Sequence, residues 1–231
     1  MMGQRKSAKG LVVLGVCLGI VWWNHWVAFA QEEPSPEARR KAEADAHSMA
    51  ADDFYDKGQV DEAVKQWREA LQLDPSLSKV HHDLGLALRD QNRLIEAISE
   101  LHEAARLDPQ NASTQADLGD ALQERGDRAG ALEAYRAAIA LVPNSAPLHS
   151  NLGYLLVQKG DLEGAIAEWR EAARLDPQYA PPHANLGEAL ESKGDAQGAI
   201  AAYEKFLSLA PDAPNAAEVR QRLSALQAAH K

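Results

Sequence analysis

The stretch that decides the fold is LGYLLVQKGDLEGAIAEWREAARLDP, residues 152–177. Apolar residues recur at spacings of three and four on both sides of Gly160, which is typical of two amphipathic helices. Gly160 tolerates the left-handed backbone that closes a helix, and Asp161 is suited to cap the next helix. Asp176 precedes Pro177, and a proline pushes the residue before it out of the α region. The stretch therefore predicts a helical hairpin.

This hairpin recurs with a fixed period of 34 residues. The prolines that end each copy are Pro75, Pro109, Pro143, Pro177 and Pro211. An alanine column holds Ala63, Ala97, Ala131, Ala165 and Ala199, and a large-residue column holds Trp67, Leu101, Tyr135, Trp169 and Tyr203. A Leu-Gly pair opens four copies, at Leu84-Gly85, Leu118-Gly119, Leu152-Gly153 and Leu186-Gly187. A period of this length predicts stacked helical hairpins, here over 44–77, 78–111, 112–145, 146–179 and 180–213.

Both ends of the array differ from its interior. Phe206 occupies a column that holds alanine in the other copies, and a ring there would block a further copy. Residues 214–231 predict a polar-backed helix that caps the array, with an apolar stripe of Val219, Leu223 and Leu226 and with Arg220, Gln221 and Arg222 outside it. Residues 31–43 are interpreted as a linker and the start of the first helix, because Ser35-Pro36 is a typical helix start.

These columns resemble those of the tetratricopeptide repeat (TPR) family, and the resemblance covers residues 44–213. It implies an all-α fold, a right-handed α-solenoid of five helix-turn-helix repeats plus a C-terminal capping helix, preceded by an N-terminal signal or anchor segment. The type it suggests is an exported or membrane-anchored bacterial protein. It also implies a non-enzymatic scaffold whose first helices line a concave groove that binds an extended peptide or a partner helix.

The resemblance places the candidate partner-binding residues in the non-packing columns of the first helices. They are Met49, Asp52, Asp83, Leu86, Arg89, Asp117, Asp120, Asn151, Tyr154, Asn185 and Glu188. Asn151 and Asn185 match positions where related arrays hold a peptide backbone, and an amide both donates and accepts hydrogen bonds. Leu86, Tyr154 and Val157 would form an apolar centre. The acids favour a neutral or basic partner, although a merely solvated face is the alternative.

Residues 1–30 predict export. A basic start (Arg5, Lys6 and Lys9) precedes an apolar run, and Ala28-Phe29-Ala30 has the small residues of a cleavage site. If the leader is uncleaved, residues 11–30 are long enough to span about 30 Å of hydrocarbon as an inner-membrane anchor. Either way the repeats are predicted to be periplasmic or extracellular, with a partner in the cell envelope. A self-associating structural spacer anchored to the membrane is the alternative function.

The charge disfavours two classes of partner. The formal net charge is −10, and the basic residues of the leader make the remainder more acidic still. Binding to nucleic acid needs clustered lysine and arginine, so it is not expected. Adhesion to an anionic lipid surface is disfavoured for the same reason, and a membrane contact is expected only through residues 11–30. The only cysteine, Cys17, lies in the leader.

Histidines raise the possibility of a metal enzyme. His47, His81, His149 and His183 share one column, but equivalent residues of successive repeats lie roughly 20 Å apart and cannot meet on one ion. They are interpreted as planar packing residues. An enzymatic alternative would need His81, His82 and His102 to hold metal. No catalytic residue, metal or cofactor is predicted, since an open helical array is not expected to enclose a cleft that shifts pKa values.

Overall fold

The computed structural model describes residues 34–229, and the predicted leader lies outside them. The described part is helical, and its helices are α2 (Pro36–Asp56), α3 (Val60–Leu73), α4 (Ser78–Asp90), α5 (Leu94–Leu107), α6 (Ala112–Glu124), α7 (Arg128–Leu141), α8 (Ala146–Lys159), α9 (Leu162–Leu175), α10 (Pro181–Ser192), α11 (Ala196–Leu209) and α12 (Ala216–Ala229). The predicted solenoid of five helical hairpins followed by a terminal helix is confirmed.

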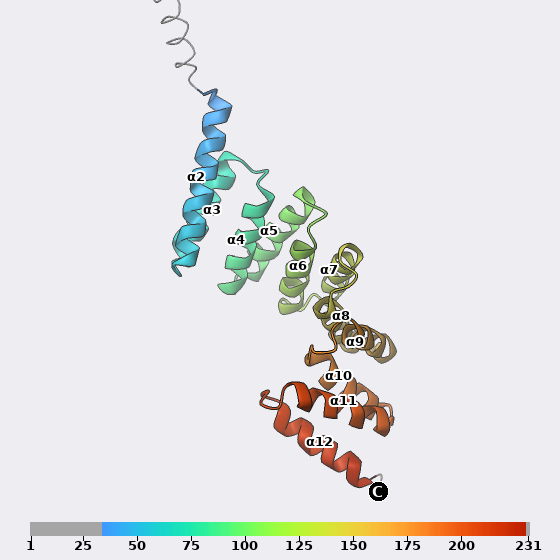
Figure 1. The fold of residues 1–231 in the computed structure, drawn as a ribbon. Coiled ribbons are helices and arrows are strands. Elements are labelled where there is room, and N and C mark those ends of the chain that lie inside the picture. The colour runs from blue at the N-terminus through green and yellow to red at the C-terminus, as the bar shows by residue number, and fades with distance from the viewer. Residues whose placement is uncertain (1–33, 230–231) are drawn as a thin grey trace, which may run out of the picture.

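The hairpins α2–α3, α4–α5, α6–α7, α8–α9 and α10–α11 stack in chain order, and α12 packs on α11. The stack bends, with α6 and α8 toward the inner side of the bend and α7 and α9 on its outer side (Figure 1). The first helices of the hairpins therefore share one continuous surface. Among residues 34–229, no helix combines the length and the hydrophobicity that crossing a bilayer requires.

The turn inside each hairpin follows from a few local residues. Gly160 has a φ of 87°, the left-handed conformation that closes α8, and Asn92 adopts a φ of 58° at the equivalent place. Asp161 then caps α9, because its Oδ1 accepts a hydrogen bond of 2.9 Å from the backbone N–H of Gly164. In the third, fourth and fifth hairpins, a left-handed glycine followed by a capping aspartate turns one helix into the next, whereas Gln59 and Arg93 at the equivalent place make no side-chain cap.

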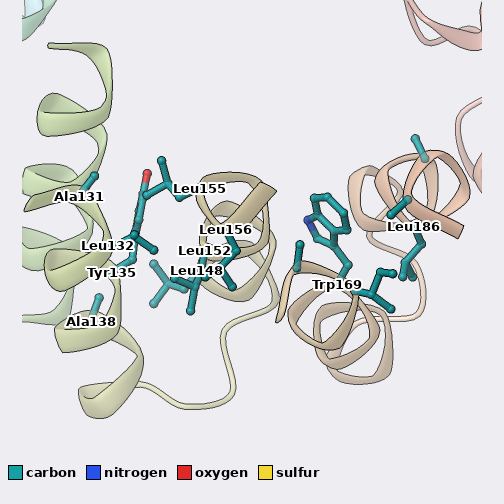
Figure 2. Close-up of a cluster of buried hydrophobic side chains, with 14 of the residues drawn as sticks. Ala131, Leu132, Tyr135, Ala138, Leu148, Leu152, Leu155, Leu156, Trp169 and Leu186 are labelled. Carbon is teal, nitrogen blue, oxygen red and sulfur yellow. The ribbon is translucent and has the colours of Figure 1, made fainter. Parts of the chain in front are cut away.

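The core is built by the large-residue column. Trp67, Leu101, Tyr135, Trp169 and Tyr203 are all buried. Figure 2 shows Tyr135 of α7 against the leucines of α8, and Trp169 beyond them on the side of Leu186. From the second repeat on, each large side chain lies on the glycine of a Leu-Gly pair. A Cβ added at Gly187 would be 2.3 Å from the Tyr203 ring, so glycine is what allows the two helices to approach this closely.

Additional helical residues cover both ends of the array. The helix α2 starts at Pro36, where Ser35 Oγ accepts a hydrogen bond of 3.1 Å from Ala38 N, so it begins before residue 44 as predicted. At the other end, Val219 of α12 is buried in the same cluster as Phe206. Arg222, outside the apolar stripe of α12, adds an ion pair to the last repeat, since its Nη1 is 3.2 Å from Oε2 of Glu191.

Candidate functional site

The candidate residues lie on α2, α4, α6, α8 and α10, and we call their shared surface the first-helix face. A series of polar contacts, which we call the polar chain, crosses this face and begins on α2 at Asp52. Asp52 accepts hydrogen bonds from Trp67 Nε1 (3.1 Å) and from Lys79 Nζ (3.2 Å). Lys79 also donates to Asp83 Oδ2 at 2.7 Å, a bond that raises the pKa of the lysine. The first two repeats are thus linked through one ammonium group.

His82 connects the part of the polar chain on α4 to the part on α6. Its Nε2 lies 2.7 Å from Asp117 Oδ2, and its Nδ1 lies 3.5 Å from Asp83 Oδ1. The hydrogen bonds to Asp117 and Asp83 outweigh the opposing effect of burial and raise the pKa of His82 to about 9. The ring therefore carries a positive charge at neutral pH.

Arg89 is the next member of the polar chain and lies among three acids of α6. Its guanidinium lies 3.6 Å from Asp120, and 3.9 Å from both Asp117 and Glu124. Burial raises the pKa of Asp120, although this carboxylate accepts a hydrogen bond from the hydroxyl of Tyr135. Asn151 of α8 is the last member of the polar chain, since its Nδ2 is 3.5 Å from the Tyr135 hydroxyl. Hydrogen bonds and partial burial therefore shift pKa values on this open surface, whereas the sequence-based expectation had connected such shifts with an enclosed cleft.

The structure divides the predicted residues into two groups. The polar chain brings together Asp52, Asp83, Arg89, Asp117, Asp120 and Asn151. Met49, Tyr154, Asn185 and Glu188 are not part of it, and Leu86 lines a hollow beside it. Tyr154 and Val157 on α8 are 49% and 41% exposed. The face thus has an ion-paired part on α2, α4 and α6, and a part on α8 and α10 that includes the exposed Tyr154 and Val157 of α8.

Two of the acids have a structural role that sequence reasoning missed. Asp52 holds the indole of Trp67, and Asp120 holds the hydroxyl of Tyr135. Where the packing residue is Leu101, which has nothing to donate, the residue in the acid's column is Leu86. Part of the signal was present in the sequence, because in those repeats the acid stands 15 residues before a ring that can donate. Glu188 has the same spacing from Tyr203, but the hydroxyl of Tyr203 bonds to Glu191. Asp52 and Asp120 therefore stabilise the core as well as line the face.

The shared histidine column also contains bridges that were not predicted. His81 is buried, with Nδ1 2.6 Å from Glu100 Oε2 and Nε2 3.2 Å from the Pro75 carbonyl. His149 repeats the arrangement with Glu168 (2.6 Å) and Pro143 (3.0 Å). Burial opposes a charged ring at His81, but its hydrogen bonds to Glu100 and Pro75 outweigh burial and raise the pKa of His81. The bridges join both helices of a repeat to the turn before it.

The histidines do not gather around a common centre. His47 bonds to Gln66 within its own repeat (2.7 Å), and His102 is exposed on α5. Within residues 34–229, no three His, Cys, Asp or Glu side chains are grouped as metal ligands would be. His47, His81, His82 and His149 instead link helices.

A hollow of about 290 Å³ opens on the first-helix face between α2 and α4. It is lined by Asp52, Tyr55, Asp56, Trp67, Lys79, Asp83 and Leu86. The Tyr55 and Trp67 rings lie with their centroids 5.6 Å apart at an angle of 49°. Tyr55 is fixed by a 3.0 Å hydrogen bond from its hydroxyl to Asp90 of the next repeat. The hollow combines aromatic surface with carboxylates.

Stability is expected to depend on pH through His82. The folded state raises its pKa from 6.5 to about 9, so its contacts stabilise the fold fully below pH 6.5 and are lost as the pH rises through 9. His82→Gln should remove this dependence. Between pH 6.5 and 9, urea unfolding should show wild type losing about 1 kcal/mol more than the variant, a value kept small because the face is partly solvated. Equal losses in the two proteins would contradict this role for His82.

Comparison with known proteins agrees with this geometry. A family model described as TPR repeat matches residues 51–88, 85–126, 119–160 and 153–194, and one described as tetratricopeptide repeat matches residues 180–213. No curated protein matches the chain.

Solved structures with a similar fold include MamA, which is 26% identical, with 69% of this chain and 93% of MamA covered and a TM-score of 0.67. YrrB, whose structure is described as that of a TPR protein with an unusual peptide-binding site, is 21% identical over 76% of this chain and 90% of its own, with a TM-score of 0.67. PilF of Pseudomonas aeruginosa is 21% identical over 81% of this chain and 93% of its own, with a TM-score of 0.63. The chain belongs to the tetratricopeptide repeat family.

Proposed function

We propose that this chain is an exported, non-enzymatic scaffold that binds a neutral or basic segment of a cell-envelope protein along its first-helix face. TPR proteins are generally scaffolds that bind protein or peptide partners. The observation that carries the proposal is the open apolar surface of Tyr154 and Val157 beside an acidic, ion-paired surface. Export rests on the leader pattern of residues 1–30.

The part of the face on α8 and α10 has the chemistry of a peptide contact. Asn151, Tyr154 and Val157 are spaced three residues apart on α8 and so share one side of that helix. A tyrosine gives a large contact area at a low cost in conformational entropy, and tyrosines are common among residues that dominate binding energy. The amides of Asn151 and Asn185 can pair with the N–H and C=O groups of an extended chain.

The charge of the other part favours a basic segment over an acidic one. On α2, α4 and α6, the carboxylates of the polar chain are Asp52, Asp83, Asp117, Asp120 and Glu124, against the cations Lys79, His82 and Arg89. The excess of negative charge would repel an acidic segment and speed the approach of a basic one.

Recovery of the partner from envelope extract tests this proposal. Wild type, the double variant Asn151→Ala with Tyr154→Ala, and the control Ile95→Ala are used as bait, each as the full chain. Ile95 is an exposed apolar residue of α5, off the first-helix face. We expect wild type and control to recover the same partner, and the double variant to bind it about 30-fold more weakly, since truncating a central tyrosine can cost about 2 kcal/mol. Undiminished recovery by the double variant would contradict the proposal.

A further inference from the structure

We propose that the hollow between α2 and α4 receives a basic side chain, lysine or arginine, of the bound segment. The proposal rests on the proposed function and specifies it: the acidic end of the first-helix face would have one defined subsite for a cation. Three properties of the hollow point to this occupant. They are its aromatic and aliphatic lining, its carboxylates, and the ammonium group that it already holds.

The lining fits the long stem of a basic side chain. The hollow of about 290 Å³ has the Tyr55 and Trp67 rings and Leu86 among its walls, and these offer apolar surface to methylene groups. Trp67 is buried and forms the floor, so the ring that a cation can reach is that of Tyr55, which is 36% exposed. The attraction is about 0.5–1 kcal/mol at an exposed site. Because the hydroxyl of Tyr55 is bonded to Asp90, its ring is held in place before any partner arrives.

The carboxylates supply the charge. Asp52, Asp56 and Asp83 all line the hollow, and Lys79 is the one basic residue among its lining residues. Asp52 and Asp83 are already occupied by Lys79 and by Trp67. Asp56, in contrast, makes no side-chain hydrogen bond or ion pair within residues 34–229. One carboxylate at the hollow is therefore open to a partner's cation.

Lys79 shows which chemistry the hollow accepts. Its ammonium lies between two carboxylates, 3.2 Å from Asp52 and 2.7 Å from Asp83, while the side chain is 71% exposed. An exposed pair of this kind contributes about 1 kcal/mol or less, so it can yield to an incoming cation. An anionic occupant would meet the excess negative charge, and an apolar one would cover carboxylates without pairing them.

The hollow is continuous with the rest of the face. The polar chain that begins at Asp52 ends at Asn151, one helical turn from Tyr154. A segment lying along the first helices would therefore place its basic residue at α2 and α4 and its apolar residue at α8. The two contacts can be tested separately.

The test uses the full chain and four peptides of sequence Gly-Ser-Gly-Xaa-Gly-Ser-Gly, acetylated and amidated, in which Xaa is Arg, Lys, Gln or Glu. The indole N–H of Trp67 is the reporter in NMR titrations, because it donates to Asp52 at the hollow. We expect saturable shifts of this signal with the Arg and Lys peptides and none with the Gln and Glu peptides.

Variants connect the binding to particular groups. Tyr55→Leu and Asp56→Asn should each weaken binding of the Arg peptide about three- to fivefold. Lys79→Met should strengthen it by a similar factor, since it removes the competing ammonium. Glu133→Gln, on the exposed surface of α7, makes the same charge change as Asp56→Asn and should leave binding unchanged. Asp56→Asn alters only an exposed side chain, so it keeps the test valid if Tyr55→Leu folds poorly.

Three results would overturn the inference: equal shifts with the Gln peptide, equal weakening by Glu133→Gln, or no gain from Lys79→Met. The native partner then separates this inference from the proposed function. If recovery depends on Tyr154 but not on Tyr55 or Asp56, only the cation subsite is wrong. If it depends on none of the three, both proposals fail.

Discussion

Trp169→Ala is expected to lower the free energy of unfolding by about 3–5 kcal/mol. Trp169 is 4% exposed and lies over Gly153, so truncation leaves a cavity at the centre of the fourth repeat. Its Nε1 donates a hydrogen bond of 3.0 Å to the Ser150 carbonyl, which would be left buried without this donor. The cavity and the lost hydrogen bond both act against the folded state.

Trp169→Leu is the control, because Leu101 fills the same column in the second repeat. It should lose less than half as much as Trp169→Ala. Urea unfolding of the full chain, followed by far-UV circular dichroism, measures both variants. A repeat array can melt in parts, so a lower or split midpoint is the expected form of the loss. A Trp169→Ala protein within about 1 kcal/mol of wild type would contradict this account of the core.

Gly187→Ala is expected to destabilise the protein by about 1–3 kcal/mol. At an ordinary helical position the same change would stabilise the helix by about 1 kcal/mol. Here the new Cβ would be 2.3 Å from Cδ1 and Cε1 of Tyr203, and the hydroxyl of that ring is held by Glu191 at 2.7 Å. The close approach of α10 and α11 therefore reverses the usual sign.

Gly85→Ala provides the comparison, because its Cβ would meet Leu101 Cγ at 2.7 Å. A leucine side chain can change rotamer, whereas a hydrogen-bonded ring inside the core cannot move as freely. Gly85→Ala should therefore cost less than Gly187→Ala in the same unfolding assay. A gain in stability at Gly187 would mean that the large-residue column does not set the distance between the helices.

The fold was predictable because its determinants are local and recur with a fixed period. Gly160, Asp161 and Pro177 act on their own turn, and each has a counterpart in other repeats. The large residue and the Leu-Gly pair lie within one repeat, so their contact follows once a hairpin is recognised. These features needed no knowledge of how one hairpin sits on the next.

The site was only partly predictable, because it depends on how neighbouring hairpins are placed. His82 and Asp117 are 35 residues apart, and only the stacking of α4 on α6 brings their side chains to 2.7 Å. The sequence columns contained Asp52 and Asp120 but did not separate carboxylates with internal partners from open ones such as Asp56. The His81–Glu100 bridge could have been found, since a histidine followed 19 residues later by glutamate recurs at His149.

The most direct test of the account is site-specific photo-cross-linking in living cells, with a benzoylphenylalanine placed at position 154 or at position 95. Both positions are exposed, but Tyr154 lies on the first-helix face and Ile95 does not. The account predicts that position 154 forms an adduct with a different polypeptide and that position 95 forms none. An adduct from position 95 alone, or one at position 154 with only a second copy of this chain, would contradict a scaffold that binds its partner through the first helices.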